Sequence, residues 1–149
     1  MNKSVFTWYV DTMSRPKAGV LIWRTSDAAR THEVVDLSTP YCGRGVWDAV
    51  REVIEERSSF VRVVDHIDQE LAPFETVVET HAEVERDKEG KFVFKFAERC
   101  VVLSISSKSS EGVPIESQIE KGNDGTTCVR TRFSDNVTFA SITSEYFIR

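Results

Sequence analysis

GRGVWDAVREVIEER, the stretch Gly43–Arg57, decides the fold that the sequence predicts. Apolar residues recur in it at the spacing of one face of an α-helix: Val46, Trp47, Val50, Val53 and Ile54. Three glutamates fall on the opposite side of the same helical wheel. The pattern therefore predicts an amphipathic helix that buries its apolar stripe, Trp47 included, against the rest of the chain.

Most of the remaining sequence is typical of β-strands, because β-branched and aromatic residues alternate with polar ones between turn residues. Strands are expected over residues 5–10, 18–25, 31–38, 58–64, 78–85, 92–96, 113–121, 126–133 and 137–148. The first three are predicted to form an antiparallel meander, residues 65–74 a polar connection and residues 104–112 a loop. Residues 87–90 fit a hairpin turn whose return strand buries Phe92, Phe94 and Phe96, and the strand over 113–121, which contains Pro114, is expected at a sheet edge. The predicted fold class is α+β, with one main helix packed on a mostly antiparallel, barrel-like sheet of seven to nine strands in a single domain over residues 1–149.

The composition is that of an ordinary globular protein, with 149 residues, 40% hydrophobic and 29% charged. No apolar run approaches the roughly 18 to 20 residues that span a bilayer. The apolar stretch near the N-terminus is too short for a signal peptide. Cys42, Cys100 and Cys128 are odd in number and far apart, which favours reduced thiols. We therefore expect a cytoplasmic protein.

Acidic residues gather in one part of the chain. Glu52–Glu89 holds twelve acidic and four basic residues, a net charge of −8, whereas the whole chain has −5. If residues 78–85 form one strand, four of its side chains share the outward face because strand side chains alternate. These candidate binding residues are Glu79, His81, Glu83 and Glu85. Such a row of carboxylates either keeps a strand face solvated or forms a docking face for a basic partner.

The order of elements in the first half resembles the opening half of the ribonuclease H-like fold. A strand ends in Asp11, two strands follow, the predicted helix carries Asp48, and a further strand ends in Asp65. In that family, carboxylates on the first strand, the first helix and the fourth strand hold two magnesium ions. The resemblance implies that Asp11, Asp48 and Asp65 would be catalytic and Mg²⁺ the cofactor. Aspartates at strand ends are also common turn residues, so a structural role is the competing interpretation.

The segment CGRG before the predicted helix is a second candidate site. Cys42 would lie near a helix N-terminus, where a thiol pKa falls, and Arg44 with free backbone amides could hold an anion. The glycines match neither a P-loop nor a dinucleotide fingerprint. They are equally explained as the turn into a helix.

No motif specific to one reaction occurs, and the sequence favours a non-enzymatic role without a cofactor. The preferred hypothesis is a small inhibitor or adaptor that docks through its acidic face on a basic, nucleic-acid-handling protein. The alternatives are a magnesium-dependent nuclease and a small-ligand or anion-binding module. No direct contact with nucleic acid or membrane is expected, and the oligomeric state stays open.

Overall fold

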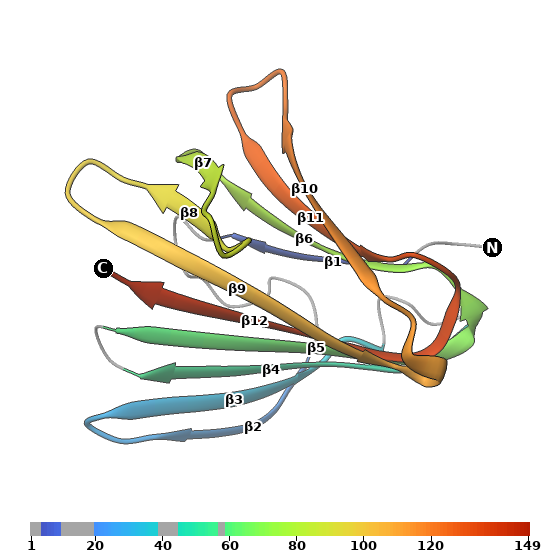
Figure 1. Ribbon diagram of the computed structural model, residues 1–149. Coiled ribbons are helices and arrows are strands. Elements are labelled where there is room, and N and C mark those ends of the chain that lie inside the picture. Colours follow the sequence, from blue (N-terminus) through green and yellow to red (C-terminus); the bar gives the residue numbers. More distant parts are fainter. Residues whose placement is uncertain (1–3, 10–19, 39–44, 57–58) are drawn as a thin grey trace.

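The structure, a computed structural model, describes residues 4–9, 20–38, 45–56 and 59–149. Strands dominate these residues, and Figure 1 shows them arranged in two layers. The strands are β1 Ser4–Tyr9, β2 Val20–Ser26, β3 Arg30–Asp36, β4 Val46–Glu56, β5 Phe60–Ala72, β6 Phe74–Thr80, β7 Glu83–Arg86, β8 Phe92–Lys95, β9 Cys100–Ser109, β10 Ile115–Lys121, β11 Thr127–Phe133 and β12 Val137–Ile148. A single turn of 3₁₀-helix, Ser110–Gly112, joins β9 to β10.

The described strands form a large and a small sheet. The large sheet has eight strands in the order β2-β3-β4-β5-β12-β9-β8-β7, and all its pairs are antiparallel. The small sheet has four strands in the order β1-β6-β11-β10, with β1 parallel to β6. The two layers meet where β5 leads into β6 and β11 into β12, and they spread apart toward the opposite end (Figure 1). Each described sheet keeps two open edges, so the predicted barrel-like closure is wrong.

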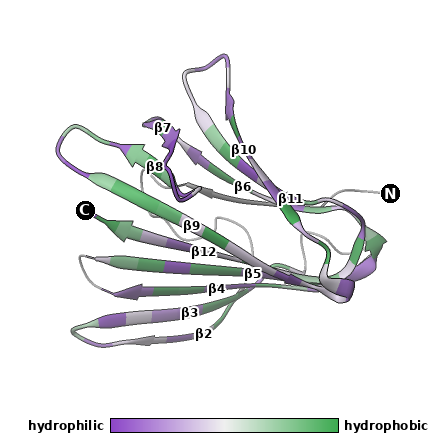
Figure 2. Ribbon diagram, in the orientation of Figure 1, coloured by the Kyte–Doolittle hydropathy of each residue, from purple (hydrophilic) through white to green (hydrophobic). Residues whose placement is uncertain are grey.

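The core lies between the two sheets. Strand alternation turns every second side chain inward, and the hydropathy colouring in Figure 2 alternates along several strands in the same way. One cluster contains Phe92, Phe94, Leu103 and Tyr146 of the large sheet with Val78 of the small sheet. The other contains residues 67, 74, 133 and 142, again from both sheets. Both clusters join the two layers, so the molecule is a β-sandwich.

The predicted helix is wrong, and with it the α+β fold class. Of the stretch Gly43–Arg57, residues 46–56 form strand β4, paired with β3 on one side and β5 on the other. Trp47, predicted to be buried, is 66% exposed beside a register irregularity between Val46 and Asp48. Ala49, Arg51 and Val53 take the inward positions instead. The expected helix–sheet contact is replaced by strand pairing in the middle of the large sheet.

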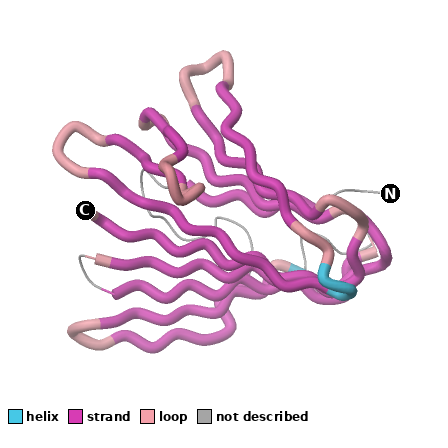
Figure 3. The backbone as a smooth tube through the Cα atoms, viewed as in Figure 1, coloured by secondary structure: helices cyan, strands magenta, loops and turns pink. Residues whose placement is uncertain are grey.

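Several strand boundaries also differ from the expectation. β5 continues to Ala72 and β9 to Ser109 (Figure 3), so residues 65–72 and 104–109 are strand instead of a connection and a loop. β1 pairs with β6 in the small sheet, which breaks the predicted meander. The hairpin around Gly90 and the burial of Phe92 and Phe94 are confirmed, as is the edge position of β10. The predicted burial of Phe96 is wrong, because Phe96 follows the end of β8 and is 37% exposed.

No helix within the described ranges is long and apolar enough to cross a membrane.

Candidate functional site

The chain changes sheet inside the segment that carries the predicted binding residues. β6 ends at Thr80 in the small sheet and β7 begins at Glu83 in the large one. The Thr80 hydroxyl accepts a hydrogen bond from the Ala82 N–H at 2.9 Å, which fixes the bend between the two strands. The expected continuous strand over residues 78–85 is therefore two strands, and their glutamates do not form one row.

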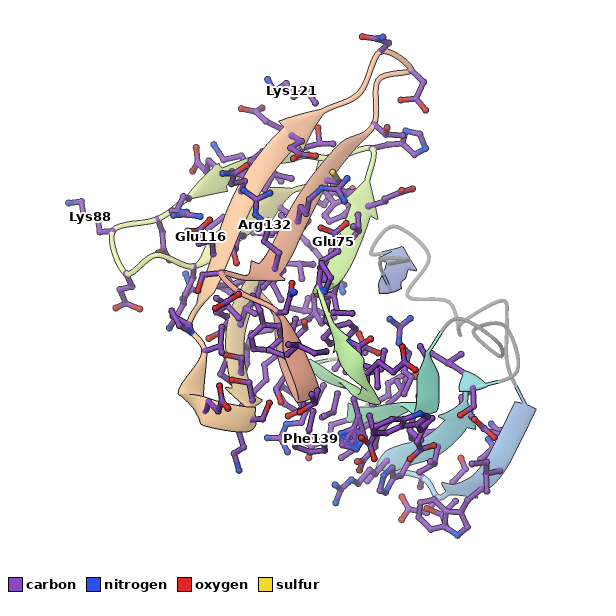
Figure 4. All side chains as sticks on the ribbon, turned by 90° about the vertical axis from the view of Figure 1, so that its right-hand side faces the viewer. Glu75, Lys88, Glu116, Lys121, Arg132 and Phe139 are labelled. Atoms are coloured by element: carbon purple, nitrogen blue, oxygen red, sulfur yellow. The ribbon has the colours of Figure 1, made fainter. Side chains whose placement is uncertain are left out.

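A shallow hollow of about 290 Å³ lies at this crossing, and we call it the crossover hollow. Its lining comes from the crossing and from the β10–β11 hairpin: His81, Ala82, Glu83, Val84, Lys121, Gly122, Gly125, Thr126 and Thr127. Figure 4 shows Lys121 near the tip of that hairpin. Two of the four predicted binding residues thus line a concave surface.

The hairpin wall of the crossover hollow is held by Asp124. Its carboxylate accepts the Thr126 N–H at 3.1 Å and the Thr126 hydroxyl at 2.5 Å. The hydroxyl bond, followed by the backbone bond, holds the pKa of Asp124 below its ordinary value, and His81 contributes to the same shift. Gly125 has φ +82°, a conformation that favours glycine. Asp124 therefore stays ionised at neutral pH on the rim of the hollow.

The three glutamates among the predicted binding residues differ in whether they have a partner. Glu85 accepts a hydrogen bond from the Lys95 ammonium at 2.9 Å on the neighbouring strand, and this bond raises the pKa of Lys95. Glu79 is half-buried on the outer face of β6, and Glu83 is exposed on β7. Neither the Glu79 nor the Glu83 side chain has an ion pair or hydrogen bond within the described part of the chain. Their charges are therefore available to a partner.

The outer face of the small sheet carries a network of ion pairs beside Glu79. Arg130 on β11 bonds Glu75 on β6 and Glu120 on β10, the latter at 3.1 Å. Desolvation opposes the charge of Arg130, but the bonds to both glutamates outweigh it and raise its pKa. Figure 4 shows Glu75, Glu116 and Arg132 on the strands of this sheet, where Arg132 lies 3.7 Å from Glu116.

The thiol of Cys128 lies near the same network. Cys128 is half-buried on β11, and desolvation followed by the Glu120 charge raises the pKa of the Cys128 thiol. A thiol held protonated is a poor nucleophile.

The carboxylates of the nuclease hypothesis do not converge. Asp65 is 3% exposed and points inward, where Arg51 donates to both of its oxygens, from Nη2 at 2.8 Å and from Nε. Asp48 is exposed and faces Asp68 across β4 and β5, on the other side of the sheet from the Arg51–Asp65 pair. Asp11 lies outside the described residues. Since the predicted helix is also a strand, the described residues do not have the ribonuclease H-like order of elements, and Asp48 and Asp65 are not brought together.

The anion-binding candidates, Cys42 and Arg44, lie outside the described residues. The remaining histidines lie apart on the outer face of the large sheet. His32 bonds Glu52 and contacts the Trp23 ring edge-on at 4.6 Å, and His66 lies 6.0 Å from Phe139. No group of three or more potential metal ligands was found in the described ranges.

The contribution of the β10–β11 hairpin to the candidate site is not visible in the sequence. Its turn, Gly122–Gly125, is visible in the sequence as a glycine-bounded turn, but it lies about 40 residues from His81. Only the pairing of β6 with β11 brings the hairpin beside the crossing. A signal of that kind is long-range and cannot be read from local periodicity.

No protein-family model and no curated protein matches this sequence. Similar solved structures include the "Heparinase III-BT4657 gene product", with a TM-score of 0.60 and 11% identity over 87% of this chain and 21% of that chain. The heparan sulfate lyase HepC from Pedobacter heparinus has a TM-score of 0.60 and 10% identity over 89% of this chain and 22% of that chain. "Heparinase III" has a TM-score of 0.54 and 15% identity over 90% and 22%. This chain spans about a fifth of their length, and at such identities the likeness shows the fold alone.

Proposed function

We propose that this protein is a non-enzymatic inhibitor or adaptor that docks on a basic protein through the crossover hollow. The observation that carries the proposal is a concave surface of about 290 Å³ lined by two of the predicted binding residues. Glu83 and Lys121 line the hollow, and Asp124 is hydrogen-bonded to Thr126, another lining residue. Glu79 precedes the lining residue His81 by two positions. A lysine or arginine side chain of the partner would enter the hollow and form charge-assisted hydrogen bonds there.

Electrostatics supports a basic partner. The chain has a net charge of −5, and Glu79 and Glu83 lack ion pairs within the described residues. Complementary charge speeds association and excludes acidic competitors. Proteins that handle nucleic acid carry lysine and arginine surfaces of the required kind, which makes them the most concrete class of partner.

Heparan sulfate, which appears in the name of one similar structure, is a poor candidate ligand for this surface. A polysulfated chain is strongly anionic and would be repelled by the carboxylates around the crossover hollow. We therefore do not propose heparan sulfate as a ligand of the crossover hollow.

A cytoplasmic location forms part of the proposal. Cys100 and Cys128 are free thiols, and the whole chain has three cysteines. Free, sparse thiols are usual in a reducing compartment.

The test uses a hexalysine peptide as a basic probe, with binding followed by fluorescence anisotropy. Glu79→Lys with Glu83→Lys should weaken binding at least about tenfold, since opposite charge is replaced by like charge. Glu55→Lys with Glu56→Lys is the matched control, because it changes the net charge equally at exposed positions at the end of β4. Raising salt from 0.1 to 1 M shortens the Debye length from about 10 to about 3 Å and should weaken wild-type binding.

Equal loss in both double variants would mean that only net charge matters, and the crossover hollow would then lose its role. Tighter binding of heparan sulfate than of hexalysine to the wild-type protein would contradict the proposal as a whole.

A further inference from the structure

One edge of the large sheet is both apolar and open. β2 is its outermost described strand and pairs with β3 alone among the described strands. Three successive side chains on it are exposed, Leu21 at 47%, Ile22 at 60% and Trp23 at 45%. The backbone groups on its free side can pair with another strand.

Of the three other described edges, β7 and β10 are guarded by charge, whereas β1 has no charged residue. β7 is only four residues long and exposes Glu83, Glu85 and Arg86. β10 carries Glu116, Glu120 and Lys121. Short length and charged side chains are the usual protection of a sheet edge against pairing with another chain. β2 is longer, with seven residues, and lacks this protection. Its one irregularity is a register shift between Leu21 and Trp23.

We propose that β2 pairs with β2 of a second copy of this chain, so that two large sheets continue into one across a two-fold axis. The chemistry of the edge favours a second copy. Arg24 is the one ionisable residue on β2, and its guanidinium lies 3.3 Å from the Glu33 carboxylate of its own chain. The edge therefore offers no charge that would select a charged partner or repel its own copy.

The geometry of such a pair is isologous. An axis perpendicular to the sheet keeps the outer faces of both copies on one side and makes the paired strands antiparallel. Trp23 and Thr25 lie opposite Val34 and His32 of β3, which places them on the outer face. The two Trp23 rings then lie on the same face near the axis and cover apolar surface on both copies.

The dimer is expected to be weak. A seven-residue strand extends about 23 Å, so two edges bury less than the roughly 1,200 Å² that marks a standard stable interface. A dissociation constant on the order of 10 μM is expected. The acidic surface elsewhere on the chain disfavours other modes of self-association.

Sedimentation velocity from about 1 to 300 μM tests the proposal. Wild type should shift from monomer to dimer, and Ile22→Lys should raise the dissociation constant at least about tenfold by placing charge on the edge. Leu71→Lys is the matched control, since Leu71 is 55% exposed but lies on β5. It should dimerise like wild type.

A second measurement needs no variant. Hydrogen exchange of the wild-type protein should slow in β2 between low and high concentration, while β7 and β10 stay unchanged. A monomer at every concentration, or equal weakening by Ile22→Lys and Leu71→Lys, would overturn the proposal. The result does not depend on the crossover hollow, so either proposal can fail alone.

Discussion

The two edge strands of the large sheet, β7 and β2, differ in length, in charge and in exposed apolar surface. β7 is short and charged, and Arg86 ties it to the small sheet by donating to the Ser117 carbonyl of β10 at 2.5 Å. The Arg86 guanidinium also lies 4.7 Å from the centre of the Phe92 ring. β2 is longer, carries exposed apolar side chains and has little charge. A charged edge selects an oppositely charged partner, whereas a neutral apolar edge can accept its own copy.

The difference extends below the surface. At the β7 end, the inward side chains Val84, Phe92 and Phe94 join the core cluster. At the β2 end, Arg24 reaches Glu33, which is 3% exposed on β3. One edge is anchored by aromatic packing and the other by backbone pairing and an ion pair. The predictions that follow test whether the two ends differ in stability as they differ in surface.

The largest effect on stability is expected for the buried Arg51–Asp65 ion pair, which joins β4 and β5 between the two edges. Arg51→Ala should lower the free energy of unfolding by about 3–5 kcal/mol, because it leaves the buried Asp65 carboxylate without its partner. Chemical denaturation measures the change. Arg51→Met with Asp65→Leu removes both charges and should recover most of the loss. Failure of this rescue would show that the ion pair does more than neutralise buried charge.

The second prediction compares the two ends directly. Phe94→Ala should cost about 3–5 kcal/mol, because a fully buried ring leaves a cavity at the β7 end. Ile22→Ala at the β2 end should lie within about 0.5 kcal/mol of wild type in dilute solution. Denaturant midpoints of both variants give the comparison. Similar losses would mean that the β2 edge is packed against other parts of the chain.

A third, smaller effect concerns Trp47 on the β2 half of the large sheet. Because its side chain is 66% exposed, Trp47→Ala should change stability by about 1 kcal/mol or less. Wild-type fluorescence should show a fraction that iodide quenches readily, to which exposed Trp47 and Trp23 contribute, and the variant should lose the Trp47 part of it. If the free energy of unfolding fell by several kcal/mol, Trp47 would be buried, as the sequence pattern predicted.

The sequence predicted most strands but mistook the central one for a helix, and the reason is physical. Val46, Val50, Val53 and Ile54 fit a helical stripe, yet they are all β-branched, which favours a strand. Period-two alternation was hidden because Arg51 occupies an inward position. A buried arginine is tolerated there since Asp65 neutralises it across the β4–β5 pair, a contact that local patterns cannot show.

The candidate site was predicted in part. Alternation correctly predicted that Phe92 and Phe94 are buried in the hairpin after the acidic segment, but it also predicted burial of Phe96, which is exposed. It could not show that the chain changes sheet at residues 81–82, because the hydrophobic period continues across the bend. For the same reason, Asp65 looked like a strand-end carboxylate, although β5 continues for seven more residues. Strand partners, and thus sites between strands, depend on pairing between distant segments.

The smallest effect sets two matched carboxylates against each other, one near each edge. Asp36 is the last residue of β3 and pairs with Val20 of β2, and its pKa is lowered by hydrogen bonds from the Ser38 side chain and then from the Ser38 N–H. Asp124, near the β7 edge, has its pKa lowered by the Thr126 hydroxyl and then by the Thr126 N–H. A carboxyl group with a depressed pKa stabilises the fold above its unfolded-state pKa, and that contribution is lost as pH falls through its folded-state pKa. Both groups therefore strengthen the protein at neutral pH and weaken it in acid.

Carbon-detected NMR titration can follow the two carboxyl groups separately. Thr126→Val should raise the pKa of Asp124 toward its ordinary value and leave Asp36 unchanged, whereas Ser38→Ala should do the reverse. Each shift should stay incomplete, because the backbone N–H bond remains in both variants. If Thr126→Val moved both midpoints, the two ends of the molecule would be coupled through the sandwich. The charged and the apolar edge could then no longer be treated as independent surfaces. Hexalysine binding and dimerisation would have to be measured together in one sample.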